Sequence, residues 1–153
     1  MKRHEYAMEL FHQGYNCCQS VFGAFADRYG IEKKQAMMLA QSFGAGMGRM
    51  REVCGTVSGM CLVIGMETGS DDPKNRDAKT NNYEMVRKLA GQFKEENGSI
   101  ICRELLGLEK DTKEGAAPSE RTAEYYKKRP CAELVGMAAK ILEEQFGVMD
   151  EIA

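Results

Sequence analysis

The sequence predicts an all-α fold, a compact bundle of about five to seven helices. Most segments repeat apolar residues at the i, i+3, i+4 spacing of a buried helix face, and we find no convincing run of the alternation that marks a strand. Glycines follow several of these segments, where they commonly end a helix. With 153 residues, 43% of them apolar, the chain can bury one good core, so we expect a single domain over residues 1–153.

Three helices are predicted in the first third of the chain. The first covers residues 4–12, whose apolar side chains fall on one face. Asn16 is a suitable N-cap for a second helix over residues 17–29, which Gly30 would end. A third helix is predicted over residues 33–43.

The middle of the chain contains two longer helices. A central apolar helix is predicted over residues 53–66, and residues 70–79 are rich in charge and turn formers, which indicates an exposed connection. An amphipathic helix is then predicted over residues 81–97. Gly55 and Gly59 lie four residues apart in the central helix, where glycine costs about 1 kcal/mol relative to alanine. We therefore expect a sulfur centre or a packed helix to approach this stripe closely.

The last third is less regular. Residues 100–108 form a short apolar turn, and residues 109–129 are polar and predict a loop, with a helix around 123–128. A final helix is predicted over residues 130–146, because its apolar residues again line one face.

Composition excludes several classes of function. A formal net charge of −2 gives no basic face for nucleic acid. The longest apolar run, residues 60–66, is far shorter than the roughly 20 residues of a membrane span. The N-terminal residues contain no continuous apolar segment for export, so we expect a cytoplasmic protein. His4 and His12 are expected on the surface.

Six cysteines in a small protein of a reducing compartment suggest metal binding or redox chemistry. The simpler interpretation is that cysteine serves as a small buried hydrophobe. Four cysteines, however, share a setting at predicted helix starts: Cys17, Cys54, Cys102 and Cys131. There, free backbone N–H groups and the helix dipole favour a thiolate. If the four helix starts converge, their cysteines form a site for thiolate chemistry or for a sulfur-ligated metal. The alternative is that cysteines fall at helix starts by chance and form no common site.

The glycine-rich segment over residues 44–49 lies directly before the central helix. It lacks the Walker lysine and follows a helix instead of a strand, so neither nucleotide-binding fingerprint fits. We expect a tight turn that lets Cys54 approach Cys17, with Arg49 and Arg51 available to stabilise a thiolate.

These motifs resemble the C_GCAxxG_C_C family of redox-active proteins. The resemblance rests on Asn16-Cys17-x-Gln19, the glycine-rich FGAGMGR, the Cys54-Gly55-x-x-x-Gly59 element and single later cysteines at 102 and 131, in the right order. It covers about residues 14–136 and implies that Cys17, Cys54, Cys102 and Cys131 are the functional set. Thr56 stands where the family has alanine. Cys18 and Cys61 lie outside the pattern and are expected to be packing residues or spare thiols.

Three functions remain open at this stage. The four cysteines could pass electrons by thiol–disulfide exchange, to a partner protein or a small-molecule acceptor. They could also ligate an iron–sulfur cluster or, less naturally for a redox role, a zinc ion, although their spacings are long. The third possibility is a structural or interaction module without redox chemistry. Covalent haem is excluded because the chain has no Cys-x-x-Cys-His sequence. The small-residue stripe in the central helix would also permit pairing in a homodimer.

Overall fold

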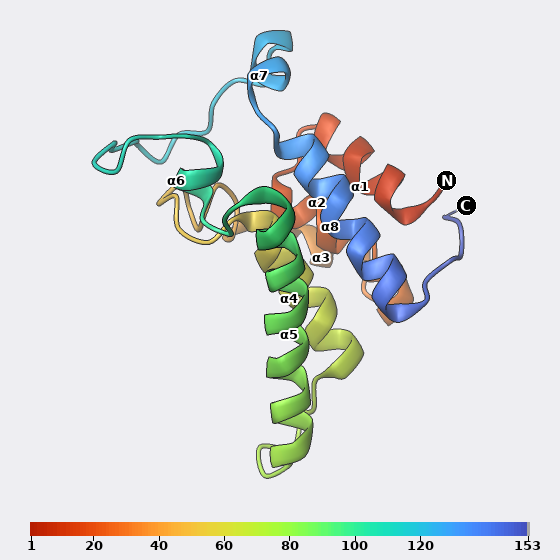
Figure 1. Cartoon of the computed structure of the whole chain (residues 1–153). Helices are drawn as coiled ribbons and strands as arrows, with labels where there is room; N and C mark the ends of the chain where they lie inside the picture. Colours follow the sequence, from red (N-terminus) through yellow and green to blue (C-terminus); the bar gives the residue numbers. More distant parts are fainter. Residues whose placement is uncertain (153) are drawn as a thin grey trace.

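The computed structural model describes residues 1–152, and it confirms the all-α class (Figure 1). The described chain contains eight α-helices and one short 3-10 helix. Their bounds are α1 (Arg3–His12), α2 (Cys17–Gly23), η1 (Ala26–Tyr29), α3 (Lys33–Gln41), α4 (Gly55–Thr68), α5 (Arg76–Asn97), α6 (Cys102–Leu105), α7 (Ala123–Lys128) and α8 (Cys131–Phe146). The count exceeds the expected five to seven by α6, a four-residue helix within the segment that was expected to form a short apolar turn.

The core lies between α1, α2, α4 and α8. Helix α8 packs along α1, while α2 lies between α1 and α4 (Figure 1). Each of these helices contributes fully buried apolar side chains, among them Leu10, Val21, Met60 and Leu142. The central position of α4 agrees with its sequence, which is apolar on all sides.

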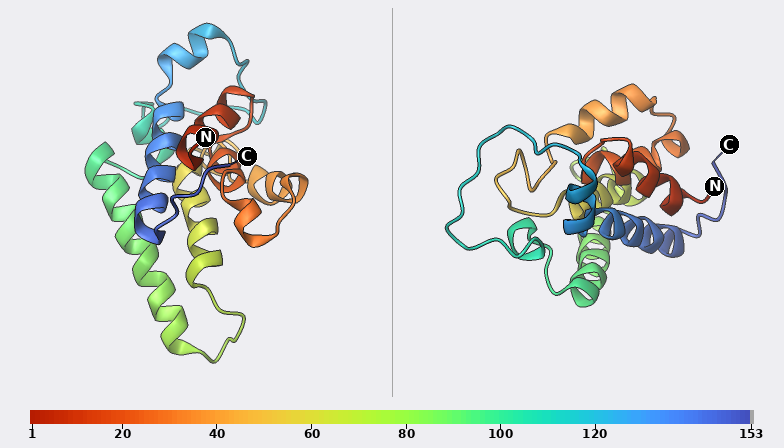
Figure 2. Two further views of the ribbon diagram at one scale, coloured as in Figure 1. Left: turned by 90° about the vertical axis from the view of Figure 1, so that its right-hand side faces the viewer. Right: turned by 90° about the horizontal axis from the view of Figure 1, so that it is seen from above.

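Helices α4 and α5 form a hairpin whose turn lies far from α1 and α8 (Figure 2). The predicted start of α5 at residue 81 was wrong, because the helix begins five residues earlier, at Arg76. Asn75 caps it, since its side-chain oxygen accepts a hydrogen bond from the backbone N–H of Ala78 at 3.0 Å. The polar composition of residues 76–79 therefore marks an exposed helical turn and not a connection.

The single helix predicted over residues 17–29 is also wrong, because α2 ends at Gly23 and η1 follows. In a continuous helix the carbonyl of Ala24 would accept from the N–H of Arg28. It accepts instead from Nη1 of Arg3 at 2.9 Å, and the N–H of Arg28 bonds to Phe25. A buried long-range contact thus overrides the local helical pattern.

The glycine stripe of α4 faces α2. A side chain at Gly55 would meet the backbone N–H of Cys18, and one at Gly59 would meet the side chain of Val21 at 2.9 Å. The expected close approach is therefore made by a packed helix. It brings the first turn of α2, with Cys17, beside the first turn of α4.

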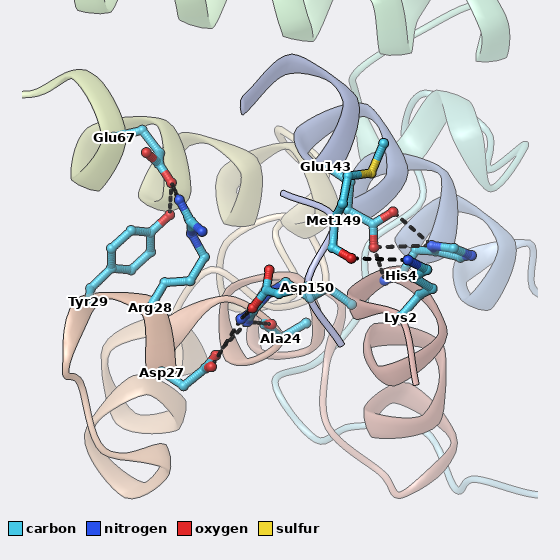
Figure 3. Close-up of polar contacts among 11 residues, drawn as sticks. Lys2, His4, Ala24, Asp27, Arg28, Tyr29, Glu67, Glu143, Met149 and Asp150 are labelled. Atoms are coloured by element: carbon cyan, nitrogen blue, oxygen red, sulfur yellow. Dashed lines mark hydrogen bonds and ion pairs between the residues drawn. The ribbon is translucent and has the colours of Figure 1, made fainter. Parts of the chain in front are cut away.

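The two ends of the chain lie side by side and are held by polar contacts (Figure 1; Figure 3). Arg3 is buried and pairs with both Asp27 and Asp150. His4, which was expected on the surface, is half-buried, and its Nδ1 is 2.9 Å from the buried carboxylate of Glu143 (Figure 3).

Among residues 1–152, no helix combines the length and apolar character that crossing a membrane requires.

Candidate functional site

All four cysteines singled out in the sequence lie at helix starts. Cys17, Cys102 and Cys131 are the first residues of α2, α6 and α8, and Cys54 is the N-cap of α4. Asn16 caps α2 as predicted, because its side chain accepts from the N–H of Gln19 at 2.9 Å.

These four helix starts converge on one cavity of about 280 Å³, which all four cysteines line. Cys18 and Cys61 do not line it. Cys18 is completely buried in the core, as expected of a packing residue, and Cys61 is half-buried on α4. The fold therefore separates the six cysteines into four at the cavity and two outside it.

Cys17 and Cys131 interact more strongly with each other than with the other two thiols of the cavity. The interaction with Cys17 is the largest cause that lowers the pKa of Cys131, to about 7. Burial opposes this shift, while the positive charges of Arg129, Arg121 and Arg51 reinforce it. The same interaction raises the pKa of Cys17, and burial raises it further. Of the two thiols, Cys131 therefore loses its proton at the lower pH.

The other two thiols behave differently from the expectation for helix starts. Burial raises the pKa of Cys54 and of Cys102, although a hydrogen bond from Arg51 partly offsets the shift at Cys102. Burial is the largest cause of the shift at both sulfurs, because loss of hydration disfavours the thiolate. A position at a helix start is therefore insufficient for a thiolate here, and only Cys131 has a lowered pKa among the four.

A short antiparallel contact between two segments aligns Cys54 with Cys102. The N–H of Cys54 donates to the carbonyl of Ile100 at 2.8 Å, and the N–H of Cys102 donates to the carbonyl of Glu52 at 2.7 Å. These bonds fix the segment before α4 against the segment before α6. Sequence periodicity could not reveal this contact, because a single bridge has no repeating pattern.

The glycine-rich segment forms the expected tight turn beside the cavity. Its backbone is left-handed at residues 45–49 and again at Arg51, including four residues that are not glycine. Such a conformation costs a non-glycine residue roughly 1–2 kcal/mol. Arg49 and Arg51 are two of these residues, and both line the cavity. The strained turn therefore directs two guanidinium groups towards the cysteines.

Arg51 contacts one of the cysteine sulfurs, that of Cys102. Its Nη1 lies 3.6 Å from the sulfur of Cys102, and its Nε lies 2.5 Å from a carboxylate oxygen of Glu114. Arg49 pairs with the same carboxylate at 2.9 Å. Glu114 comes from the long connection after α6, which arcs beside the glycine-rich turn (Figure 2).

Sequence reasoning missed two further arginines of the cavity, Arg121 and Arg129. Arg129 stands two residues before Cys131, which is the one signal that the sequence offered. Arg121 belongs to the connection before α7, where no periodicity relates it to the helices it contacts. Its Nη1 and Nη2 donate to the carbonyls of Phe11 and Tyr15 at 2.9 and 3.0 Å.

Thr56, the residue that replaces the family alanine, lies beneath the cysteines. Its hydroxyl is completely buried and makes no hydrogen bond that satisfies ordinary geometry. It lies close enough to the thiols of Cys17 and Cys54 to lower both pKa values, against the stronger effect of burial on each thiol. Threonine thus adds a potential donor to a thiolate that alanine would lack.

Four cysteine sulfurs are also the donors that zinc and iron–sulfur clusters use. Among residues 1–152, however, no three cysteine, histidine, aspartate or glutamate side chains lie close enough together to hold a metal ion. The arrangement is one interacting thiol pair, Cys17 and Cys131, with two further thiols on the wall of the same cavity.

The fold and the cavity define an all-helical protein with four cysteines at converging helix starts. Residues 15–145 match the family described as "Putative redox-active protein (C_GCAxxG_C_C)", and the chain belongs to this family. The match spans most of the chain and includes all four cysteines of the cavity. No curated protein and no solved structure shows a significant match.

Proposed function

We propose that the protein is a dithiol–disulfide redox protein in which Cys131 attacks and Cys17 resolves. The observation that carries this proposal is the interaction of the Cys17 and Cys131 thiols in one cavity, because it raises the pKa of Cys17 and lowers that of Cys131. Disulfide exchange requires a thiolate and a nearby resolving thiol, and this pair supplies both.

The exchange proceeds in two displacements with a disulfide substrate. The Cys131 thiolate attacks one substrate sulfur, the substrate S–S bond breaks, and the departing thiolate takes up a proton as the first product thiol. Cys17 then loses its proton and attacks the Cys131 sulfur of the mixed disulfide. The second substrate thiolate leaves and is protonated. The protein dithiol is oxidised to a Cys17–Cys131 disulfide, and the substrate disulfide is reduced to two thiols.

Cys54 and Cys102 take a different part in this proposal. Burial raises the pKa of both, so they remain protonated near neutral pH and do not compete with Cys131 for the substrate. They line the cavity wall beside the reacting pair, where as neutral thiols they add no negative charge.

The proposal is tested by mapping the disulfide that forms when the fully reduced, metal-stripped protein is treated with hydroxyethyl disulfide. We expect peptide mass spectrometry to find Cys17 joined to Cys131. Cys17→Ser should stop at a mixed disulfide on Cys131, because the resolving thiol is missing. As matched controls, Cys18→Ser and Cys61→Ser should leave the product unchanged. Formation of a different disulfide, or of none, would contradict the proposal.

A further inference from the structure

The charges around the cavity are strongly one-sided. Four arginines line it, namely Arg49, Arg51, Arg121 and Arg129, and no aspartate or glutamate does. One nearby carboxylate, Glu114, pairs with Arg49 and Arg51. Even with a thiolate at Cys131, the positive charges exceed the negative charges at this site.

Arg121 and Arg129 account for the excess. Among residues 1–152, neither of them forms an ion pair with a carboxylate. Arg121 is held over the ring of Phe11, at 4.3 Å from its centroid, so its charge has a fixed position without being neutralised. Arg129 lies 5.6 Å from the ring centroid of Tyr125, and within the described chain its guanidinium makes no hydrogen bond. Its donors remain available to a ligand.

We propose that the cavity binds a small disulfide that carries carboxylate groups, with Arg129 and Arg121 as the groups that recognise its charge. This inference rests on the proposed redox function and specifies its substrate class. A guanidinium presents several N–H donors in a planar arrangement that matches a carboxylate. Because Arg129 stands two residues before Cys131, a carboxylate bound there places the remainder of a small substrate near the attacking sulfur.

The size of the cavity favours a small molecule over a protein disulfide. Its volume of about 280 Å³ lies near the lower end of the roughly 300–1,000 Å³ that small-molecule sites occupy. Its wall also includes apolar side chains, among them Leu105, Leu106 and Leu134, which can cover the carbon and sulfur atoms of such a compound.

The test compares three small disulfides of different charge: anionic dithiodipropionate, neutral hydroxyethyl disulfide and cationic cystamine. The rate of oxidation of the Cys17–Cys131 pair is measured for each, and divided by the rate of the same disulfide with free mercaptoethanol. We expect the corrected rate to be about tenfold higher for the anionic than for the neutral disulfide, and lowest for the cationic one. The preference should shrink as salt is added, because salt screens accessible charges.

Arg129→Gln isolates the recognition of charge from the reactivity of the thiol. The substitution also removes a charge that lowers the pKa of Cys131, which slows the attack on every disulfide alike. The ratio of anionic to neutral rates cancels this common effect, and we expect the ratio to fall roughly threefold to fivefold. Lys127→Gln is the matched control, because it removes the same charge from an exposed residue that does not line the cavity. Its ratio should equal that of the unmodified protein.

The outcomes separate this inference from the proposed function. Equal corrected rates for the three disulfides would overturn the inference and leave the redox function standing. So would an unchanged ratio in Arg129→Gln, or an equal loss in Lys127→Gln. Failure of all three disulfides to oxidise the pair would contradict the redox function, and the inference with it.

Discussion

Arginines occur in two opposite settings at the two ends of α1. At the chain termini, Arg3 is almost fully buried, with two carboxylates and one backbone carbonyl as its partners. At the cavity, Arg121 and Arg129 are half-buried and have no carboxylate partner among residues 1–152. The first setting neutralises a cation and links distant segments. The second leaves positive charge beside a thiol.

The comparison shows which charges support the fold and which are free for chemistry. A buried cation is tolerated when its partners replace the lost hydration, and its removal then costs stability. A half-exposed cation without a carboxylate contributes little to stability, but its field acts on nearby groups. At the cavity that field lowers the pKa of Cys131.

The largest effect on stability is expected for Arg3→Met. This change removes the links to Asp27 and Asp150 and leaves the carbonyl of Ala24 without its donor. Both carboxylates are more than half exposed and can regain water, so we expect a loss of about 3 kcal/mol in the free energy of unfolding, measured with urea. Labelling of Cys131 should be unchanged.

Arg28→Met is the control for this variant, because the Arg28 side chain, which pairs with Glu67, is 31% exposed against 2% for Arg3. Its cost should stay below about 1 kcal/mol. Equal losses in the two variants would show that burial of the Arg3 network does not distinguish it from a surface pair.

The next effect concerns pH and the core thiol Cys18. Burial raises its pKa from 9.0 to about 12, so the unfolded chain loses this proton at a lower pH than the folded one. The stabilisation is complete below about pH 9 and is lost as pH rises towards 12. Between about pH 8 and pH 10 we expect Cys18 to account for a loss of about 1.4 kcal/mol in the free energy of unfolding.

Cys18→Ala tests this assignment through the pH dependence and not through absolute stability. Between about pH 8 and pH 10, the free energy of unfolding of the variant should fall by about 1.4 kcal/mol less than that of the unmodified protein. Identical pH dependence would show that Cys18 ionises equally in both states. Cys131 provides the contrast, because its lowered pKa gives a contribution of opposite sign: present above pH 9 and lost as pH falls through about 7.

A smaller effect is expected for Thr56→Val. Valine keeps the shape of threonine but removes a buried hydroxyl that makes no ordinary hydrogen bond. We expect the free energy of unfolding to rise by about 1 kcal/mol. The pKa values of Cys17 and Cys54 should rise as well, because a group that lowers both is gone. A lower free energy of unfolding in Thr56→Val would mean that the Thr56 hydroxyl makes a stabilising hydrogen bond in solution.

Much of the fold followed from the sequence because helical periodicity and caps are local signals. Helix α7 begins and ends where it was predicted, and Asn16 caps α2 as expected. The wrong end predicted for α2 has a non-local cause, because the side chain of Arg3 donates a hydrogen bond to the carbonyl of Ala24 just after the helix ends. Residues 76–79 form the first turn of α5, which the sequence did not predict, because these residues are polar and an exposed helical turn needs no apolar stripe.

The sequence predicted the four cysteines of the site but not the two arginines, Arg121 and Arg129, that add positive charge to it. Position at a predicted helix start selected the four cysteines that line the cavity, but it did not indicate which of their thiols has the lowest pKa. The differences in pKa depend on burial and on Arg129 and Arg121, which the tertiary structure brings to Cys131. The pairing of Cys17 with Cys131 likewise joins segments more than a hundred residues apart, beyond any sequence periodicity.

The most direct test of the account is the rate of iodoacetamide labelling of each cysteine against pH, in reduced and metal-stripped protein. We predict a midpoint for Cys131 near pH 7, with Cys54 and Cys102 reacting only at higher pH. Cys17→Ala should move the Cys131 midpoint upward, because the neighbour that lowers its pKa most is removed. A midpoint for Cys131 at or above the ordinary value of 9.0, or one that Cys17→Ala leaves in place, would contradict the claim that this pair forms the reactive centre.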